Sequence, residues 1–300
     1  MSSPDEKVAI LGCKGMLGSD VADECKNRGI DFDVFDLPEF DITNEKQLLN
    51  VVGNHKTIIN CAAYTNVDKA ESETALAFRV NAEAVGNLGY LARKFNAWVL
   101  HISTDFVFDG AGSEPNTEKD IPHPINAYGR TKLAGERLLD ENKCRHCIIR
   151  VEWTYGMNGD NFVKKFLQKA ATLASAKQGE AGQKELQVVD DQFGSPTATT
   201  EAAKAVCDLM LKKPIGVFHF ASQDYTSRFG VAQFIAETLN LDLVLKTCKT
   251  ADFPSPAARP LNSRFECSKI RPLLSGPIKN WQIPLEEFLR KVCPERSRSV

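Results

Sequence analysis

A glycine turn directly after the first apolar run constrains the fold of this chain more than any other feature. Residues 7–11 are apolar and lead into Gly12-x-x-Gly15-x-x-Gly18, and a pattern of helical period follows through Arg28. This order reads as strand, turn and helix. Such glycines let the backbone approach a pyrophosphate at the positive end of the helix dipole. The spacing differs from G-x-G-x-x-G and could be turn chemistry alone, but its position after a strand favours dinucleotide binding.

A second apolar run, residues 32–35, ends in Asp36. An acid at this point can accept hydrogen bonds from the adenosine ribose and repel a 2′-phosphate. The cofactor expected is therefore NADH or NADPH, with NADH slightly favoured. Lys14 in the glycine turn could partly offset the repulsion, and the alternative for Asp36 is a solvated loop acid.

The first half continues with alternating strands and helices. Residues 57–60 and 98–102 have the composition of strands, and residues 74–95 are alanine-rich and helical. This alternation predicts an α/β fold, a Rossmann-type doubly wound parallel sheet. Ligands bind at the carboxyl ends of such strands. The glycine turn, Asp36, the loop after Asn60 and the Ser103-Thr104 pair would all lie there.

Tyr128 and Lys132 are four residues apart and would share one face of a helix. A lysine cation beside a phenol favours the phenolate and would lower the pKa of the tyrosine. The pair therefore predicts a proton donor, although the same spacing also occurs by chance in surface helices.

The second half of the chain contains further predicted elements. The expected elements are two helices, a polar connector and two strands, in the order helix 162–173, connector 177–184, strand 186–189, helix 200–211 and strand 216–220.

Composition excludes several classes of protein. The chain has 300 residues, 43% of them hydrophobic, which suffices for a large core. Its net charge of −2 does not indicate the positively charged surface that nucleic-acid binding requires. No apolar run reaches the ~20 residues of a membrane span, and the polar start MSSPDEK is no signal peptide, so a cytoplasmic enzyme is expected.

The nine cysteines, an odd number at irregular spacings, predict free thiols. Cys144-x-x-Cys147 is interpreted as the start of a strand, and no metal site is expected.

Several segments together resemble one enzyme family. They are Gly12 to Gly18, NCAAYTNVDKAE (60–71), Val80-Asn81, STDFVFDG (103–110), PINAYGRTKLAGE (124–136), RVEWTYG (150–156), VVDDQFGSPT (188–197) and RPLNSR (259–264). The glycine and Tyr-x-x-x-Lys motifs are typical of the extended short-chain dehydrogenase/reductase superfamily. VDKAE, DQFGSPT and RPLNSR resemble its dTDP-4-dehydrorhamnose reductase family.

The resemblance implies a fold, a reaction and a set of site residues. Residues 1–151 and 186–220 would form the dinucleotide-binding domain with the main sheet, and residues 152–185 and 221–300 a smaller C-terminal substrate lobe. A nicotinamide cofactor would deliver hydride to C4 of a dTDP-linked 4-keto-6-deoxy hexose, with dTDP-L-rhamnose as product. The implied catalytic residues are Thr104, Tyr128 and Lys132. The implied cofactor-binding residues are Gly12, Gly15, Met16, Leu17, Asp36, Cys61, Ala62, Ala63, Tyr128 and Lys132, and the implied substrate-binding residues are Thr104, Asp105, Phe106, Trp153, Arg259, Asn262 and Arg264.

Four positions depart from the family pattern. Phe106 stands where the family usually has tyrosine, Val151-Glu152 replace serine or threonine before Trp153, and Met16 replaces a frequent glutamine. The lost hydroxyl at Phe106 and the carboxylate of Glu152 leave the hexose open, whereas Met16 affects little, because backbone groups do most of the binding in the glycine turn. Two other functions stay open as well: a non-catalytic dinucleotide-binding subunit, like the regulatory subunit of methionine adenosyltransferase, and a related keto-sugar-nucleotide reductase or epimerase. The expected partner is a small-molecule sugar nucleotide, without nucleic acid or membrane, and a homodimer is left open.

Overall fold

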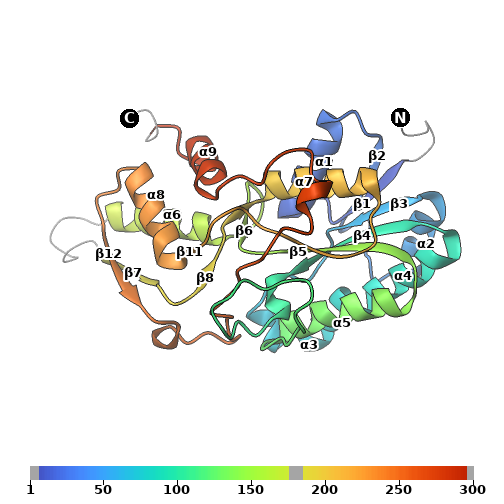
Figure 1. Cartoon of the computed structure of the whole chain (residues 1–300), viewed down its shortest axis with the longest axis horizontal. Coiled ribbons are helices and arrows are strands. Elements are labelled where there is room, and N and C mark those ends of the chain that lie inside the picture. Colours follow the sequence, from blue (N-terminus) through green and yellow to red (C-terminus); the bar gives the residue numbers. More distant parts are fainter. Residues whose placement is uncertain (1–6, 176–184, 296–300) are drawn as a thin grey trace.

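The chain folds into a large sheet covered by helices and a smaller lobe at one end (Figure 1). The computed structural model describes residues 7–175 and 185–295. The predicted connector 177–184 lies outside these residues. In the part of the chain that is described, no helix is long and apolar enough to span a bilayer.

The main sheet has six parallel strands, which confirms the predicted doubly wound α/β fold. Their order across the sheet is β10-β5-β4-β3-β1-β2. The strands are β1 (Val8–Leu11), β2 (Phe32–Phe35), β3 (Thr57–Asn60), β4 (Trp98–Thr104), β5 (Arg145–Val151) and β10 (Gly216–Phe220). The chain reverses its direction of winding between β1 and β3, where a crevice forms at the carboxyl ends of the strands.

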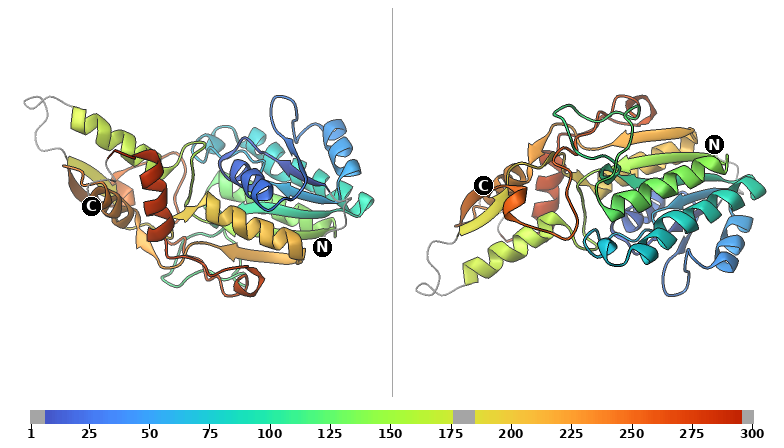
Figure 2. Two further views of the ribbon diagram at one scale, coloured as in Figure 1. Left: turned by 90° about the horizontal axis from the view of Figure 1, so that it is seen from above. Right: turned by 90° about the horizontal axis from the view of Figure 1, so that it is seen from below.

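Helices cover both faces of this sheet, because successive strand residues point to opposite sides. Val8 and Ile10 pack in a core with α1 (Met16–Asn27) and α7 (Thr199–Lys212). Ala9 and Leu11 pack in a second core with α2 (Glu45–Asn54), α4 (Ala84–Phe95) and α5 (Ala127–Glu141). The two views of Figure 2 show these layers from opposite sides.

The helix predicted over residues 74–95 has an irregular centre. It consists of α3 (Thr74–Phe78), a π-helical turn (Arg79–Glu83) and α4. Asn81 in the π turn accepts a hydrogen bond from the Tyr64 amide at 2.8 Å and donates to Thr131 of α5 at 3.1 Å. Such turns are frequent at functional sites. Here the turn ties the loop after β3 to the helix that carries Tyr128 and Lys132.

The lobe has its own apolar core. Helices α6 (Phe162–Ser175), α8 (Arg228–Thr238) and α9 (Gln282–Val292) contribute to it together with Trp281 and Val188. Short strand pairs join the lobe to the sheet domain: β6 (Thr154–Tyr155) with β9 (Thr197–Ala198), and β8 (Phe193–Gly194) with β11 (Thr226–Ser227). Four 3₁₀ turns complete the elements, at Lys69–Glu71, Asp105–Val107, Thr250–Asp252 and Arg271–Leu273.

One predicted strand belongs to a different sheet from the one expected. Strand β7 (Glu185–Val189) pairs with β12 (Val244–Cys248) in a two-stranded ribbon of the lobe, so the prediction that residues 186–189 return to the main sheet is wrong. Only Val188 of this strand is buried. A strand of a parallel sheet that is covered on both faces is buried more evenly. Residues from α7 to β10 do return to the main sheet.

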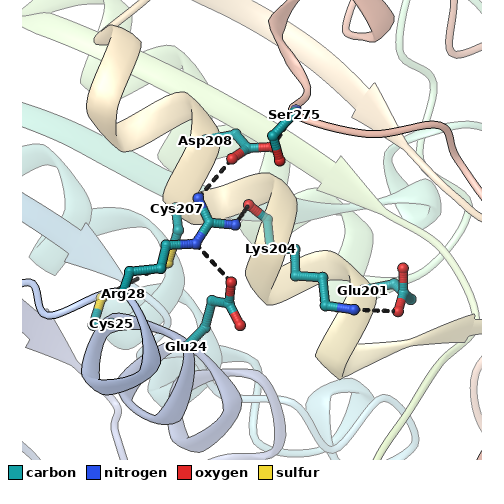
Figure 3. A network of polar contacts seen from close by, with 8 residues as sticks. All are labelled: Glu24, Cys25, Arg28, Glu201, Lys204, Cys207, Asp208 and Ser275. Carbon is teal, nitrogen blue, oxygen red and sulfur yellow. Dashed lines mark hydrogen bonds and ion pairs between the residues drawn. The ribbon is translucent and has the colours of Figure 1, made fainter.

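A polar network joins α1, which follows the glycine turn, to α7 (Figure 3). The Arg28 guanidinium donates to Glu24 and to Asp208, each at 2.6 Å. The second oxygen of Asp208 accepts hydrogen bonds from the backbone and side chain of Ser275. Beside this network the buried Cys25 and Cys207 thiols lie 3.7 Å apart. The network therefore fixes the end of α1 against α7 and against the segment that carries Ser275.

We expect Asp208→Ala to lower the free energy of unfolding by about 1.5–3 kcal/mol, the range for hydrogen bonds to charged groups. The substitution leaves the partly buried Arg28 and the Ser275 amide without this acceptor. Urea unfolding measures the change. Glu286→Ala, which breaks the exposed Glu286–Arg290 pair within α9, is the matched control and should cost no more than about 1 kcal/mol. Equal losses in the two variants would contradict a stabilising role for the network.

Candidate active site

A cleft of about 750 Å³ lies at the carboxyl ends of the parallel strands and extends to the lobe. Most of the site residues expected from sequence line it. They are Gly12, Gly15, Met16, Leu17, Asp36, Cys61, Ala62, Ala63, Thr104, Asp105, Phe106, Tyr128, Lys132 and Trp153. Arg259 lines an adjoining cavity of about 230 Å³. Asn262 and Arg264 line neither of these two cavities.

The glycine turn has the close backbone packing that a phosphate cradle needs. Gly12 has a φ of +78°, and a Cβ there would lie 2.6 Å from the Ala62 nitrogen. Gly15 is the N-cap of α1, which has no acidic residue in its first turn. The N-terminus of this 12-residue helix therefore offers free amides and a positive dipole end to the cleft. These residues fit the diphosphate of a dinucleotide.

Asp36 is held at the end of β2 by two backbone amides. Its carboxylate accepts hydrogen bonds from the Lys14 and Leu37 nitrogens, each at 2.7 Å. The Lys14 ammonium binds the Leu37 carbonyl and the Glu39 carboxylate. The Lys14 ammonium is thus paired with Glu39, which lies outside the cleft, whereas the Asp36 carboxylate belongs to the cleft wall.

Helix α5 brings Tyr128 against the end of β4. Asn126 caps the helix by accepting a hydrogen bond from the Gly129 amide at 2.8 Å, and it donates to the Ala258 carbonyl of the segment that returns from the lobe. A Cβ on Gly129 would lie 2.1 Å from the Phe106 carbonyl oxygen, so only glycine lets the helix approach so closely. The Phe106 ring meets Tyr128 edge-on, with ring centroids 5.6 Å apart.

The pKa of Tyr128 is raised from its ordinary value, whereas the sequence predicts a lowered one. Burial is the main cause and the Asp105 carboxyl the second, while a hydrogen bond with Thr104 opposes them. The Lys132 nitrogen contacts the Ile102 carbonyl at 2.7 Å and the His101 ring at 3.1 Å, and it adds no resolved stabilisation of a phenolate. Tyr128 therefore keeps its proton at neutral pH, which is the state that a proton donor needs.

Thr104 lies at the end of β4 within hydrogen-bonding reach of the Tyr128 hydroxyl. Its hydroxyl also contacts Asp105 at 2.9 Å and accepts a hydrogen bond from the Phe106 amide at 3.2 Å. Asp105 is buried and accepts a hydrogen bond from Ser263; burial raises its pKa, although these hydrogen bonds oppose the shift. Two hydroxyl groups thus converge on one point of the cleft, where a carbonyl oxygen could be bound and protonated.

Arg228, the first residue of α8, is a site residue that the sequence reading missed. Its guanidinium lies 3.6 Å from the centroid of the Trp153 ring and lines the cleft. Burial lowers its pKa to about 10, so it remains a cation at neutral pH. Within residues 7–175 and 185–295, we find no hydrogen bond from this guanidinium to another residue. Its donors are therefore available to a ligand, and it carries no sequence motif that could have revealed it.

Glu152, one of the departures from the family pattern, lies behind Trp153 and not in the cleft wall. It is fully buried, and its Oε1 accepts a hydrogen bond from the Ser195 amide at 3.1 Å. Its Oε2 has no hydrogen-bond partner among the described residues. Burial, followed by the Asp105 carboxyl, raises the pKa of Glu152 well above its ordinary value. Burial thus favours the neutral form of Glu152, which does not line the cleft.

The arginines of RPLNSR have different surroundings. Arg259 forms an ion pair with Asp68 at 2.9 Å and faces the Phe106 ring. Arg264 donates to Asn262 at 2.8 Å and lies over the rings of Phe193 and Tyr225. Asn262 in turn donates to the Glu114 carbonyl at 2.7 Å. Of these two arginines, Arg259 is therefore the one that lies beside the cleft.

Comparison with known proteins gives one consistent family. The model of the RmlD substrate binding domain matches residues 6–293. A dTDP-4-dehydrorhamnose reductase of Aggregatibacter actinomycetemcomitans is 34% identical, over 94% of this chain and 98% of that protein. A crystal structure of such a reductase from Clostridium acetobutylicum has a TM-score of 0.87 at 34% identity, covering 95% of this chain and 99% of that one. Another from Bacillus anthracis, in complex with NADP, has a TM-score of 0.87 at 33% identity, covering 96% and 99%.

Proposed function

Because the chain belongs to the dTDP-4-dehydrorhamnose reductase family, we propose that it reduces the C4 keto group of dTDP-4-dehydrorhamnose to give dTDP-L-rhamnose. It is an oxidoreductase that uses a nicotinamide dinucleotide. The bound dinucleotide supplies the hydride. The residues of the chain bind the two ligands, hold the carbonyl and deliver the proton.

The observation that carries this proposal is the meeting of Thr104 and Tyr128 in the cleft. Thr104, whose hydroxyl donates to Asp105 in this structure, would turn that proton to the carbonyl oxygen as the oxygen gains charge. Tyr128, which is protonated at neutral pH, would pass its proton to the forming alkoxide. Together with Lys132 these residues favour a catalyst over a non-catalytic dinucleotide-binding subunit.

We assign the cofactor to the half of the cleft built by the first three strands. The Gly12 to Leu17 turn would bind the diphosphate, and Asp36 the adenosine ribose. Cys61, Ala62 and Ala63 would line the nicotinamide half, where Lys132 would bind the ribose. The fit of the glycine turn against Ala62 supports this arrangement.

We assign the sugar nucleotide to the half of the cleft that faces the lobe. Asp105, Phe106 and Trp153 would surround the sugar. Arg228, stacked on Trp153, and Arg259 would meet the diphosphate, because a guanidinium matches phosphate oxygens with paired donors. Asn262 and Arg264 would act at the nucleoside end only if the substrate extends beyond the cleft.

Cofactor oxidation with dTDP-4-dehydrorhamnose, run beside GDP- and UDP-linked keto sugars, tests the proposed reaction. We expect the dTDP-linked sugar to have the highest kcat/KM. A higher value with another nucleotide would favour a related keto-sugar reductase. Dinucleotide binding without turnover on any of them would favour the regulatory subunit.

We expect NADH to have a higher kcat/KM than NADPH, because a 2′-phosphate would face the Asp36 carboxylate. In Asp36→Ala the ratio of the two efficiencies should move toward NADPH by about tenfold, since the carboxylate is half-exposed and its field partly screened. Asp31→Ala, at an exposed acid outside the cleft, is the control. A wild-type preference for NADPH that Asp36→Ala does not alter would show that Asp36 is only a solvated loop acid.

We expect Arg228→Ala to raise the KM for the sugar nucleotide by about 10- to 100-fold, equivalent to the loss of ~1.5–3 kcal/mol from a charge-assisted hydrogen bond. The affinity for the dinucleotide should be unchanged, because Arg228 lies on the lobe side of the cleft. Arg264→Ala is the matched comparison, since that arginine is bound to Asn262 outside the cleft. A larger rise in Arg264→Ala would instead assign the diphosphate to the RPLNSR segment.

A further inference from the structure

Three buried polar side chains form a chain of hydrogen bonds behind the candidate cofactor site. They are Asn60 at the end of β3, His101 in β4 and Lys132 in α5, and none is more than 2% exposed. Asn60 Nδ2 lies 3.1 Å from His101 Nδ1, and His101 Nε2 lies 3.1 Å from Lys132 Nζ. At one end Asn60 Oδ1 accepts from the Ala62 amide at 3.1 Å, and at the other Lys132 donates to the Ile102 carbonyl at 2.7 Å.

The Ala62 amide determines the tautomer of His101. Because Asn60 presents its oxygen to the Ala62 N–H, it presents its NH₂ group to His101. His101 Nδ1 must therefore accept, and a neutral imidazole whose Nδ1 accepts carries its proton on Nε2. An imidazolium would set an N–H against the amide NH₂. Burial, the largest cause, lowers the pKa of His101 well below its ordinary value, which agrees with a neutral ring.

The proton state of Lys132 follows from this tautomer. His101 Nε2–H points at Lys132 Nζ, so the lysine nitrogen must accept a hydrogen bond. An ammonium has three donors and no lone pair, whereas a neutral amine can accept from His101 and donate to Ile102. Burial lowers the pKa of Lys132 to about 8, although Glu136 and Cys61 act in the opposite direction. In the observed arrangement Lys132 is therefore a neutral amine.

When Lys132 is protonated, the donors and acceptors along this chain of hydrogen bonds must exchange roles. His101 Nε2 would then accept from the ammonium, and Nδ1–H would need an acceptor. Asn60 can supply one by turning its amide over, which directs its NH₂ toward the Ala62 N–H and breaks that hydrogen bond. Ala62 lines the cleft beside Gly12. The reversal thus leaves the N–H of Ala62, a residue of the cleft wall, without its acceptor.

We propose that Asn60 and His101 are positioning residues that couple the protonation of Lys132 to the release of the Ala62 N–H at the cofactor side of the cleft. One proton enters from solvent. His101 passes its Nε2 proton to Lys132 and binds the solvent proton at Nδ1, so that the ring stays neutral. A dinucleotide that accepts from the Ala62 N–H would favour the charged lysine, and the charged lysine would bind the dinucleotide more tightly.

The other ionisable groups around this chain of hydrogen bonds either have partners of their own or are neutral. On α5, Glu136 binds Arg150 of β5 in a buried ion pair at 2.6 Å, and it accepts a hydrogen bond from Ser103 of β4. His146 of β5, which also faces His101, contacts Cys144. Cys61, after β3, has its pKa raised to about 12 by burial and stays a neutral thiol. Tyr128 precedes Lys132 on α5 and stays protonated.

Nitrogen NMR of the ligand-free protein with ¹⁵N-labelled histidine tests the switch directly, because the two neutral tautomers have different nitrogen shifts. The chain has five histidines, and the signals of His101 are those lost in His101→Gln. We expect the Nε2–H tautomer above the Lys132 pKa of about 8 and the Nδ1–H tautomer below it. One unchanged tautomer across this range, or an imidazolium, would overturn the proposal.

The pH dependence of dinucleotide affinity tests the coupling. We expect the Kd of the wild-type protein for NADH to decrease as pH falls through the Lys132 pKa, by at most about tenfold per pH unit, the limit for one proton. In Asn60→Asp the carboxylate can accept from the Ala62 N–H and from His101 Nδ1–H together, so this dependence should shrink to less than about twofold per unit. His146→Gln, beside the chain of hydrogen bonds, should behave as wild type.

An equal pH dependence in wild type and Asn60→Asp would overturn the coupling. Urea unfolding checks that Asn60→Asp is folded, and His101→Gln, whose amide can serve either orientation, provides a second uncoupled variant. The coupling rests on the proposed function only for the identity of the dinucleotide. The tautomer measurement needs neither ligand nor turnover, so a wrong substrate assignment would leave its result intact.

Discussion

Tyr128→Phe is expected to lower kcat by about 10²-fold or more, the range for the loss of a positioned general acid. The substitution removes the hydroxyl that lies within reach of Thr104 and keeps the ring that packs against Phe106. Dinucleotide affinity should change little, because the Gly12 turn and Lys132 are untouched. Steady-state kinetics and calorimetric titration measure the two quantities separately.

Tyr64→Phe is the matched control for this substitution. The Tyr64 hydroxyl binds Glu73 at 2.6 Å and does not line the cleft, so kcat should stay within about twofold of wild type, as expected for a surface hydrogen bond. If Tyr128→Phe kept kcat within a few fold of wild type, the proton would have to come from another group. Asp105, which burial tends to keep protonated, would be the first alternative.

The elements of the sheet domain could be predicted because their signals are local. The apolar runs that end at Gly12 and Asn60 are short and bounded, and the strands that they form, β1 and β3, are buried along their whole length. A strand buried on both faces has that composition whatever its partners. Strand β7 has no such signal. Its residues are mostly exposed or half-buried, and its partner β12 lies far along the chain. The sheet to which it belongs is set by tertiary pairing, which composition does not encode.

Site residues that belong to a sequence motif could be predicted, whereas a residue that tertiary packing alone brings to the site could not. The glycine turn, Thr104 and Tyr128 belong to motifs and line one cleft. Arg228 is one of 37 lysines and arginines, and only the packing of α8 against the loop after β5 places it on Trp153. Arg264 has a motif, but Asn262 and two aromatic rings hold it outside the cleft.

Sequence spacing also could not show the direction in which Lys132 points. Residues four apart on a helix are neighbours, yet a long side chain can turn to any partner within its reach. Here the lysine reaches the Ile102 carbonyl and His101 on β4. The lysine nitrogen is therefore bound to β4 rather than to Tyr128. The pKa of Tyr128 is raised by burial and by Asp105 instead.

Thr104→Val is expected to lower kcat by about 10²- to 10³-fold, equivalent to ~2.7–4 kcal/mol, as for the loss of other single donors to a developing oxyanion. Valine keeps the shape of threonine at the end of β4 but removes the hydroxyl near Tyr128.

The Thr104 hydroxyl also contacts Asp105 and accepts from the Phe106 amide, so a loss of stability could imitate a loss of catalysis. Thr104→Ser separates the two, because serine keeps the hydroxyl and loses only a buried methyl group. We expect Thr104→Ser to retain most of the wild-type kcat, and both variants to bind the dinucleotide as wild type does in calorimetric titration. Equal losses of kcat in the two variants would assign the effect to packing, and a loss of dinucleotide affinity in Thr104→Val would place Thr104 in the cofactor site rather than at the reacting carbonyl.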